Sequence, residues 1–252
     1  MKTTNRRNFI QTVAMGTVAS LSIPQIVSAA IEASPKGKKI SLKKDDIILF
    51  QGDSITDWGR DKKNNNPNDF LALGHGYVLL ATCKLLKDNP DKNFQIYNKG
   101  ISGNKVFQLA DRWDTDCLDL KPNVISIMVG VNDYWHTLGG GYKGTIETYR
   151  TDYKNLMDRT TQALPNAKFI IIEPYGVKGV KAVTDAWYPA FDEYRQAAHD
   201  IADQYNTAFI PSQAIFDKAI ELAPGSYWTG DGVHPSLAGA ELLSHAWLET
   251  VK

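Results

Sequence analysis

The chain has 252 residues with 28 basic and 28 acidic side chains, so its formal net charge is zero. This balance gives no reason to expect nucleic acid or an anionic membrane surface as a partner. The length suits one large α/β domain with a sizeable core better than two small domains.

The first thirty residues have the pattern of an export signal. Paired arginines, Arg6 and Arg7, precede a mildly apolar stretch over 12–27 and the small residues at 28–30. A charged start, an apolar middle and a small-residue end are typical of signal peptides. With Phe9 behind them, the arginines resemble the twin-arginine type, which carries folded proteins across a membrane. An ordinary secretory signal and an uncleaved anchor are the alternatives.

This pattern divides the chain into three expected parts. Residues 1–29 are expected to form the export signal, 30–45 a linker and 46–252 a single folded domain. Cleavage near Ala29 and Ala30 would leave a periplasmic or secreted protein without stable membrane insertion, because no later segment reaches the ~20 apolar residues of a membrane span.

Short apolar runs alternate with amphipathic stretches after residue 45. The predicted strands are residues 46–50, 94–98, 124–129, 169–172 and 208–210. The predicted helices are residues 75–87, 105–118, 145–164, 189–205, 212–222 and 236–250. This alternation predicts a parallel sheet with helices on both faces. In a 2-1-3-4-5 strand order, right-handed crossovers put Cys83 and Cys117 on opposite faces, which favours two free thiols.

Chemistry in such a sheet gathers at the carboxyl ends of the strands. Gly52, Asp53 and Ser54 follow the first strand directly. A serine becomes a nucleophile only when a neighbouring base takes its proton and a third group holds that base. Asp231 and His234 lie three residues apart in a loop with glycine and proline, so one loop could supply both groups.

The other histidines are weaker candidates for the base. His199 and His245 fall inside predicted helices, where surface or packing roles are expected. His75 opens a predicted helix, and His136 follows the third strand and could line a site without being the base.

Donors for a developing oxyanion could come from the ends of the second and third strands. Gly103 could present a backbone N–H with no side chain in the way, and Asn132 could present a side-chain amide. Each residue could also have a purely structural role, Gly103 as a turn glycine and Asn132 as a helix cap.

Taken together and in this order, four segments resemble the conserved blocks of the SGNH (GDSL-type) hydrolases. They read "GDSIT", "GISGN", "GVND" and "DGVHPS". The resemblance covers nearly the whole chain from Ile47 to the last predicted helix. It implies a three-layer α/β/α fold of the flavodoxin-like kind around a five-stranded parallel sheet.

The resemblance also implies roles for the site residues. Ser54 is the implied nucleophile, His234 the general base and Asp231 the partner of the base. The implied oxyanion hole consists of the Ser54 N–H, the Gly103 N–H and the Asn132 side chain.

The remaining polar residues of the blocks receive structural interpretations. Gly100 is expected to serve a turn, and Asp53, Asp57 and Asp133 to serve turns and caps. On these interpretations no metal site is predicted, and the family implies no cofactor.

The family spans carbohydrate O-acetylesterases, lipases, arylesterases, thioesterases and lysophospholipases, so the substrate needs a further signal. Flat aromatic faces in an open site suit sugar rings, whereas a lipid site more often uses aliphatic side chains and a long apolar lid. Aromatic residues close to the blocks are predicted to contact substrate, with packing of the loops as the alternative. They are Trp58, Tyr134, Trp135, Tyr227 and Trp228.

Two further segments sharpen the substrate prediction. "GVNDYWHTLGGGYKGTIETYRTDYKNLM" and "IIEPYG" resemble exported bacterial SGNH esterases associated with polysaccharide deacetylation. We therefore expect a serine carboxylic-ester hydrolase that removes acetyl groups from plant-type polysaccharide or its oligosaccharides. The alternatives are a broad short-chain aryl or alkyl esterase, a lysophospholipase, and a noncatalytic glycan-binding module, which would have a broken triad.

Overall fold

Five parallel strands form the centre of the fold, and the computed structural model describes residues 22–33 and 38–252. The strands are β1 (Ile47–Gly52), β2 (Gln95–Asn98), β3 (Val124–Met128), β4 (Lys168–Ile172) and β5 (Ala208–Ile210). Their order is β2-β1-β3-β4-β5, and every neighbouring pair is parallel. The predicted α/β fold and strand order are therefore confirmed.

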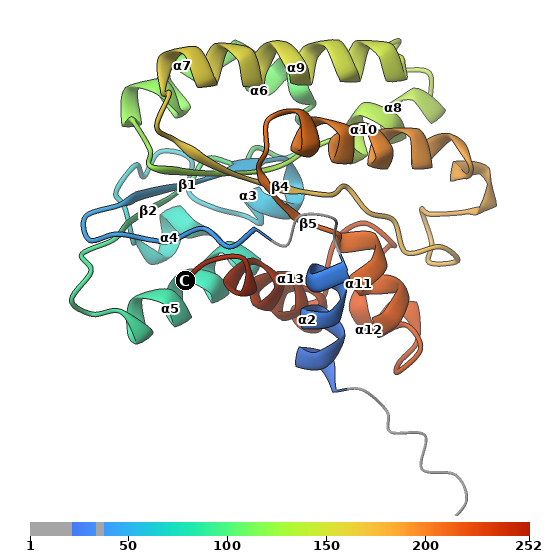
Figure 1. Ribbon diagram of the computed structural model, residues 1–252. Helices are drawn as coiled ribbons and strands as arrows, with labels where there is room; N and C mark the ends of the chain where they lie inside the picture. The colour runs from blue at the N-terminus through green and yellow to red at the C-terminus, as the bar shows by residue number, and fades with distance from the viewer. Residues whose placement is uncertain (1–21, 34–37) are drawn as a thin grey trace, which may run out of the picture.

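Helices cover both faces of the sheet (Figure 1). One face carries α6 (Val106–Asp111), α7 (Trp113–Asp116), α8 (Val131–Leu138), α9 (Ile146–Ala163) and α10 (Ala190–Gln204). The other carries α2 (Ile23–Ala33), α4 (Phe70–Leu73), α5 (Tyr77–Asp88), α11 (Ser212–Ala219), α12 (Gly225–Trp228) and α13 (Leu237–Glu249). Short 3₁₀ turns occupy Leu118–Leu120 and Asp185–Trp187. Cys83 on α5 is exposed and Cys117 after α7 is buried, and both are free, as predicted.

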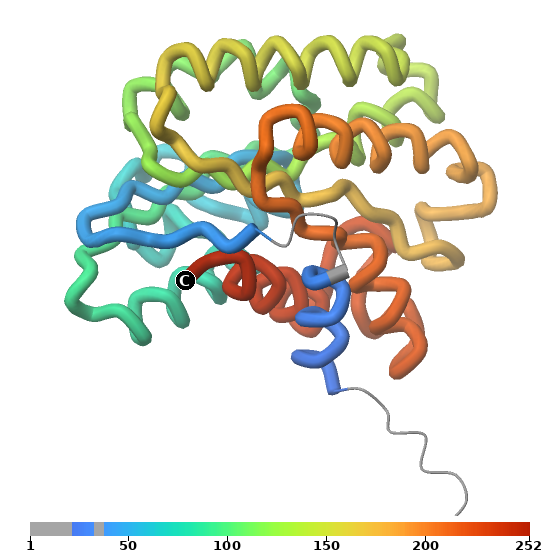
Figure 2. The backbone as a smooth tube through the Cα atoms, in the orientation of Figure 1, coloured from blue at the N-terminus to red at the C-terminus, as the bar shows by residue number. Residues whose placement is uncertain are grey.

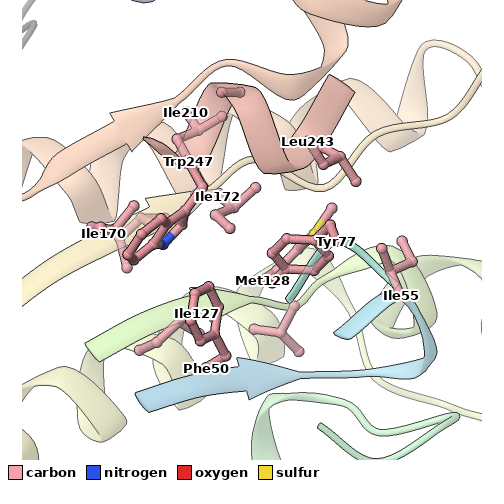
Figure 3. Packing of buried hydrophobic residues seen from close by; sticks show 14 of the residues in the cluster. Phe50, Ile55, Tyr77, Ile127, Met128, Ile170, Ile172, Ile210, Leu243 and Trp247 are labelled. Atoms are coloured by element: carbon pink, nitrogen blue, oxygen red, sulfur yellow. The ribbon is translucent and has the colours of Figure 1, made fainter. Parts of the chain in front are cut away.

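The core lies on both sides of β1, β3 and β4, whose side chains point alternately to the two helical layers. All five residues of β3 are buried, which explains its continuous apolar run. On the α13 face, the rings of Phe50 and Trp247 pack with centroids 4.9 Å apart (Figure 3). Trp247 also donates its indole N–H to Ser126 Oγ at 3.2 Å. The one polar side chain inside β3 is thereby hydrogen-bonded.

The stretch predicted as one helix over 105–118 is broken at Arg112. Its backbone dihedrals, φ −112° and ψ 9°, end α6 and precede α7. The Arg112 guanidinium donates to the Lys99 carbonyl at 2.7 Å and to Asn104 Oδ1 at 2.9 Å. These contacts tie the break to the loop after β2, so tertiary structure overrides local helical spacing here.

Helix α2 packs against α11 and α13. It is followed by residues 34–37, which are outside the described ranges. Its Val27 and Ile31 are buried. In Figure 2, α13 lies between α5 and α2. The boundary expected at residues 29–30 falls inside α2, whereas Arg6, Arg7 and Phe9 lie outside the described residues. Within the described ranges, no helix is long and apolar enough to cross a membrane.

Candidate active site

The end of β1 places Ser54 at the carboxyl edge of the sheet. A Cβ on Gly52 would lie 2.3 Å from the Met128 carbonyl oxygen, so only glycine fits where β1 leaves β3. Asp53 then caps the short helix α3 (Ser54–Asp57), because its Oδ1 accepts the Ile55 N–H at 3.0 Å. Ser54 is therefore the first residue of α3, half-buried and reachable from solvent.

The structure brings Ser54, His234 and Asp231 together. Ser54 Oγ lies 2.8 Å from His234 Nε2, and His234 Nδ1 lies 2.7 Å from Asp231 Oδ2. This is the arrangement in which a carboxylate orients an imidazole and the imidazole can take the serine proton.

One carboxylate fixes both the histidine ring and the turn that carries it. Asp231 Oδ1 accepts the Val233 N–H at 2.9 Å and the His234 N–H at 2.8 Å. Burial would raise the pKa of Asp231, but the hydrogen bonds from the His234 amide and ring and from the Val233 amide outweigh it, so this pKa lies below its ordinary value. Asp231 is thus held ionised beside the imidazole.

The loop after β4 supports the histidine turn, a contact that the sequence reasoning missed. The Gly232 carbonyl accepts the Val177 N–H at 2.7 Å, and the Asp231 carbonyl accepts the Ala182 N–H at 3.0 Å. Gly232 has φ +97°, and a Cβ there would lie 2.7 Å from the Val180 carbonyl oxygen. A glycine within a catalytic loop was the available signal for this close approach.

Of the two predicted oxyanion donors outside α3, Gly103 lies in the loop between β2 and α6, and Asn132 lies in the first turn of α8. Gly103 has φ +82°, and a Cβ there would meet only His136, at 3.9 Å. Among the described residues, none accepts the Gly103 N–H. Asn132, near the start of α8, is 3% exposed and donates to the Asn104 carbonyl at 3.3 Å. The Asn132 amide is therefore tied to the loop that presents Gly103.

Asp57 has a larger role than the turn role expected from the sequence. It is buried, and its Oδ2 accepts the Ser102 N–H at 2.9 Å and the Ser102 hydroxyl at 2.6 Å. Burial would raise the pKa of Asp57, but the bonds from Ser102 and Lys62 hold it below its ordinary value. A Cβ on Gly100 would lie 2.4 Å from the Asp57 amide nitrogen. These contacts fix the Gly103 loop against α3.

Two of the five predicted aromatic contacts lie beside the histidine. The ring centroids of Trp58 and Trp135 are 5.8 Å and 6.2 Å from that of His234, and both tryptophans are half-buried. Tyr227 is 57% exposed, and its ring packs edge-on against Trp228.

Tyr134 and Trp228, which were also predicted to contact substrate, are both buried by packing within the protein. Tyr134 is 5% exposed, lies against Trp187 and donates its hydroxyl to the Ala186 carbonyl. Trp228 is also 5% exposed and donates its indole N–H to the Ala223 carbonyl at 3.1 Å. Sequence distance from the blocks did not reveal which way these rings point.

Two carboxyl groups are buried behind the site. Burial raises the pKa of Asp53 to about 7, with the Ile55 amide and the charge of His234 acting in the opposite direction. Burial also raises the pKa of Asp133 to about 7, against the hydrogen bond from the Val106 amide. Within the described chain, Oδ2 of each carboxyl is buried without a hydrogen-bond partner. The same ranges contain no cluster of three histidine, cysteine, aspartate or glutamate side chains that could hold a metal ion.

Asp133→Asn is expected to flatten the dependence of stability on pH. The unfolded Asp133 ionises near pH 3.8 and the folded one near pH 7, so the contribution of this carboxyl is fully present below pH 3.8 and is lost as pH rises to 7. Across that window the free energy of unfolding of wild type should fall with rising pH more steeply than that of the variant, by about 1.4 kcal/mol per pH unit. Urea unfolding at four pH values between 4.5 and 7.5 measures both slopes, and Asp111→Asn on the exposed face of α6 is the control. Equal slopes for wild type and Asp133→Asn would contradict the buried-acid assignment.

Comparison with known proteins decides the family. The model of the GDSL-like lipase/acylhydrolase family matches residues 50–242. The chain belongs to this GDSL-like family. An acetylxylan esterase from Geobacillus stearothermophilus is 34% identical over 206 residues, covering 81% of this chain and 93% of that protein. The predicted membership of the family and the predicted serine esterase class are confirmed.

Solved structures of the GDSL-like family have the same fold. A Parabacteroides merdae protein assigned as a GDSL-like lipase is 50% identical, with a TM-score of 0.82 over 84% of this chain and 98% of its own. A structure of the Geobacillus stearothermophilus acetylxylan esterase is 31% identical, with a TM-score of 0.76 over 84% and 96%. Catalytic mutants of that enzyme replace a serine, an aspartate or a histidine by alanine. Its aspartate and histidine are three residues apart, like Asp231 and His234.

Proposed function

We propose that this esterase removes O-acetyl groups from carbohydrate, with plant-type polysaccharide or its oligosaccharides as substrate. The observation that carries the proposal is the hydrogen-bonded chain of Ser54, His234 and Asp231 in a protein 34% identical to an acetylxylan esterase. Half-buried Trp58 and Trp135 beside the histidine support a sugar substrate, because flat ring faces stack well on sugar rings.

The geometry supports acyl transfer in two stages. His234 takes the Ser54 proton as Oγ attacks the acetyl carbonyl, and the Ser54 N–H, the Gly103 N–H and the Asn132 amide stabilise the oxyanion. His234 then protonates the departing sugar oxygen, which leaves an acetyl group on Ser54. Water, deprotonated by His234, attacks this ester, and acetate leaves as the proton returns to Ser54. Asp231 orients the imidazole and stabilises its charged form throughout.

The rival functions differ in what the site would need. A noncatalytic glycan-binding module would not need Ser54 and His234 in hydrogen-bond contact, so the 2.8 Å separation argues against it. A broad short-chain esterase or a lysophospholipase would use the same three residues. These rivals would act on esters with no sugar, so substrate choice separates them from the proposal.

Acetate release from acetylated xylooligosaccharides tests the proposal, with nitrophenyl acetate and nitrophenyl palmitate measured in parallel. We expect the oligosaccharides and nitrophenyl acetate to be hydrolysed and the palmitate ester to be left intact. Hydrolysis of nitrophenyl acetate without acetate release from oligosaccharide would favour the broad esterase. Rapid palmitate hydrolysis would favour a lipid substrate.

We also propose that the protein is exported by the twin-arginine route to the periplasm or beyond. The support is the sequence pattern of Arg6, Arg7, the mildly apolar stretch and the small residues at 28–30. Cell fractionation with N-terminal sequencing of the mature chain tests this. Processed protein outside the cytoplasm is the expected result, and a full-length cytoplasmic chain would contradict it.

A further inference from the structure

A groove opens beside the candidate active site, on the side of α8. It has a volume of about 610 Å³ and is formed by the start of α6, the exposed face of α8 and the loop that follows α8. Trp135 lines this groove while its ring also lies 6.2 Å from the ring of His234. The groove and the candidate active site are therefore neighbours that share Trp135.

Aromatic rings line the groove. The rings of Phe107 and Tyr142 stack with centroids 5.9 Å apart and an interplanar angle of 16°. Phe107 is 37% exposed and Tyr142 is half-buried, so the rings remain in contact with solvent. A flat, exposed aromatic wall next to an esterase site suits a second sugar ring of the same substrate.

One buried cation also lines the groove. Lys105 is only 8% exposed, and its ammonium lies 4.9 Å from the centre of the Tyr142 ring. No aspartate or glutamate lines the groove, and within the described chain Lys105 forms no salt bridge. Burial lowers the pKa of Lys105, against the attraction of Asp133, which sits behind the groove with its carboxyl buried. The ammonium is thus partly dehydrated and faces an aromatic ring, without a carboxylate partner in contact.

His136 does not add a second charge to the groove. It lines the same wall, and burial together with the charge of Lys105 lowers its pKa. The neutral imidazole can exchange hydrogen bonds with sugar hydroxyls, whereas Lys105 remains the cationic group.

We propose that this groove binds a sugar that carries a carboxylate, with Lys105 pairing with the carboxylate and the Phe107–Tyr142 wall stacking on the ring. The esterase would then prefer acetylated glycans that contain an acidic sugar, such as a hexuronic acid, next to the acetylated unit. A carboxylate from the ligand supplies the counter-charge that the described protein does not place on Lys105. This inference rests on the proposed carbohydrate substrate and adds a specificity residue outside the reacting groups.

The test compares two acetylated xylooligosaccharides of equal length, one with a glucuronic acid branch and one without. Wild type is expected to show a lower KM for the acidic substrate, by roughly three- to tenfold. Lys105→Met should abolish this preference by raising KM for the acidic substrate while leaving its kcat in place. Lys143→Met, which removes the same charge from an exposed position in the loop after α8, should retain the preference. Equal KM values for the two substrates in wild type would overturn the inference, as would an equal loss on both substrates in Lys105→Met.

A binding measurement separates this inference from the proposed function. In Ser54→Ala protein, isothermal titration calorimetry can measure binding of deacetylated xylooligosaccharides with or without the acidic branch, and of sialyllactose as a different acidic sugar. Tighter binding of an acidic sugar that Lys105→Met weakens roughly three- to tenfold supports the groove, whichever acid binds better. Identical affinity for acidic and neutral sugars overturns it. If acidic sugars bind but wild type releases no acetate from either oligosaccharide, the proposed function fails and the groove assignment stands.

Discussion

Ser54→Ala is expected to lower kcat on nitrophenyl acetate by about 10⁴-fold or more while the fold stays intact. The reason is that Ser54 Oγ is the oxygen that lies 2.8 Å from His234 Nε2. Without it, no covalent acetyl intermediate can form, and only hydrolysis by water near the oxyanion donors remains. Steady-state kinetics on the purified variant measure the loss.

Two observations make this expectation specific to the nucleophile. The variant should show the same circular dichroism and melting temperature as wild type, because Ser54 is half-buried and its hydroxyl bonds only to His234 among the described residues. Ser226→Ala, an exposed serine on α12, should leave kcat unchanged. Retention of most activity by folded Ser54→Ala would show that the nucleophile lies elsewhere.

Asn132→Ala is expected to lower kcat by roughly 10²–10³-fold with little change in KM. The Asn132 amide is already held by the Asn104 carbonyl at 3.3 Å, so it stands in place before substrate binds. Its bond to the carbonyl oxygen strengthens as that oxygen becomes charged, and the loss therefore appears in the transition state.

The split between kcat and KM distinguishes this role from ordinary substrate binding. Steady-state kinetics on nitrophenyl acetate are the measurement. Asn155→Ala, an exposed asparagine on α9, is the matched control and should behave as wild type. A large rise in KM at constant kcat would assign Asn132 to ground-state binding and remove it from the oxyanion hole.

The sequence predicted the sheet well because hydrophobic runs and strand order follow general rules. Apolar stretches such as 124–129 are long enough to indicate buried parallel strands, and right-handed crossovers leave few topologies. Short helices were harder to predict. The four residues of α3 and of α12 are too few for a periodic pattern. Both helices are instead fixed by hydrogen bonds from other segments, Ser102 to Asp57 of α3 and Ser236 to the Tyr227 carbonyl of α12.

The direction of individual side chains was the second feature that could not be predicted from the sequence. Trp135 and Tyr134 are neighbours in the chain, yet one lies beside His234 and the other packs against Trp187. Successive residues of a helix point about 100° apart, so the outcome depends on how α8 is rotated against α10. No helix was predicted around Asn132, so no rotation could be assigned to these side chains. The contact between Lys105 and the Tyr142 ring could not be predicted either, because Tyr142 lies 37 positions further along the chain.

The contact between Ser54 and His234 joins positions 180 residues apart, and the pairing of Ile40 with Val251 joins positions still further apart. Closing such long separations costs chain entropy that is smaller once the intervening chain is ordered, so these contacts are expected to form late in folding. A partly folded chain with its sheet in place but α13 undocked would lack a positioned His234. Ester hydrolysis should therefore recover after the bulk of secondary structure in a refolding experiment, and loss of activity should precede loss of circular dichroism on gradual unfolding. Ester hydrolysis is therefore expected only from the completely folded chain.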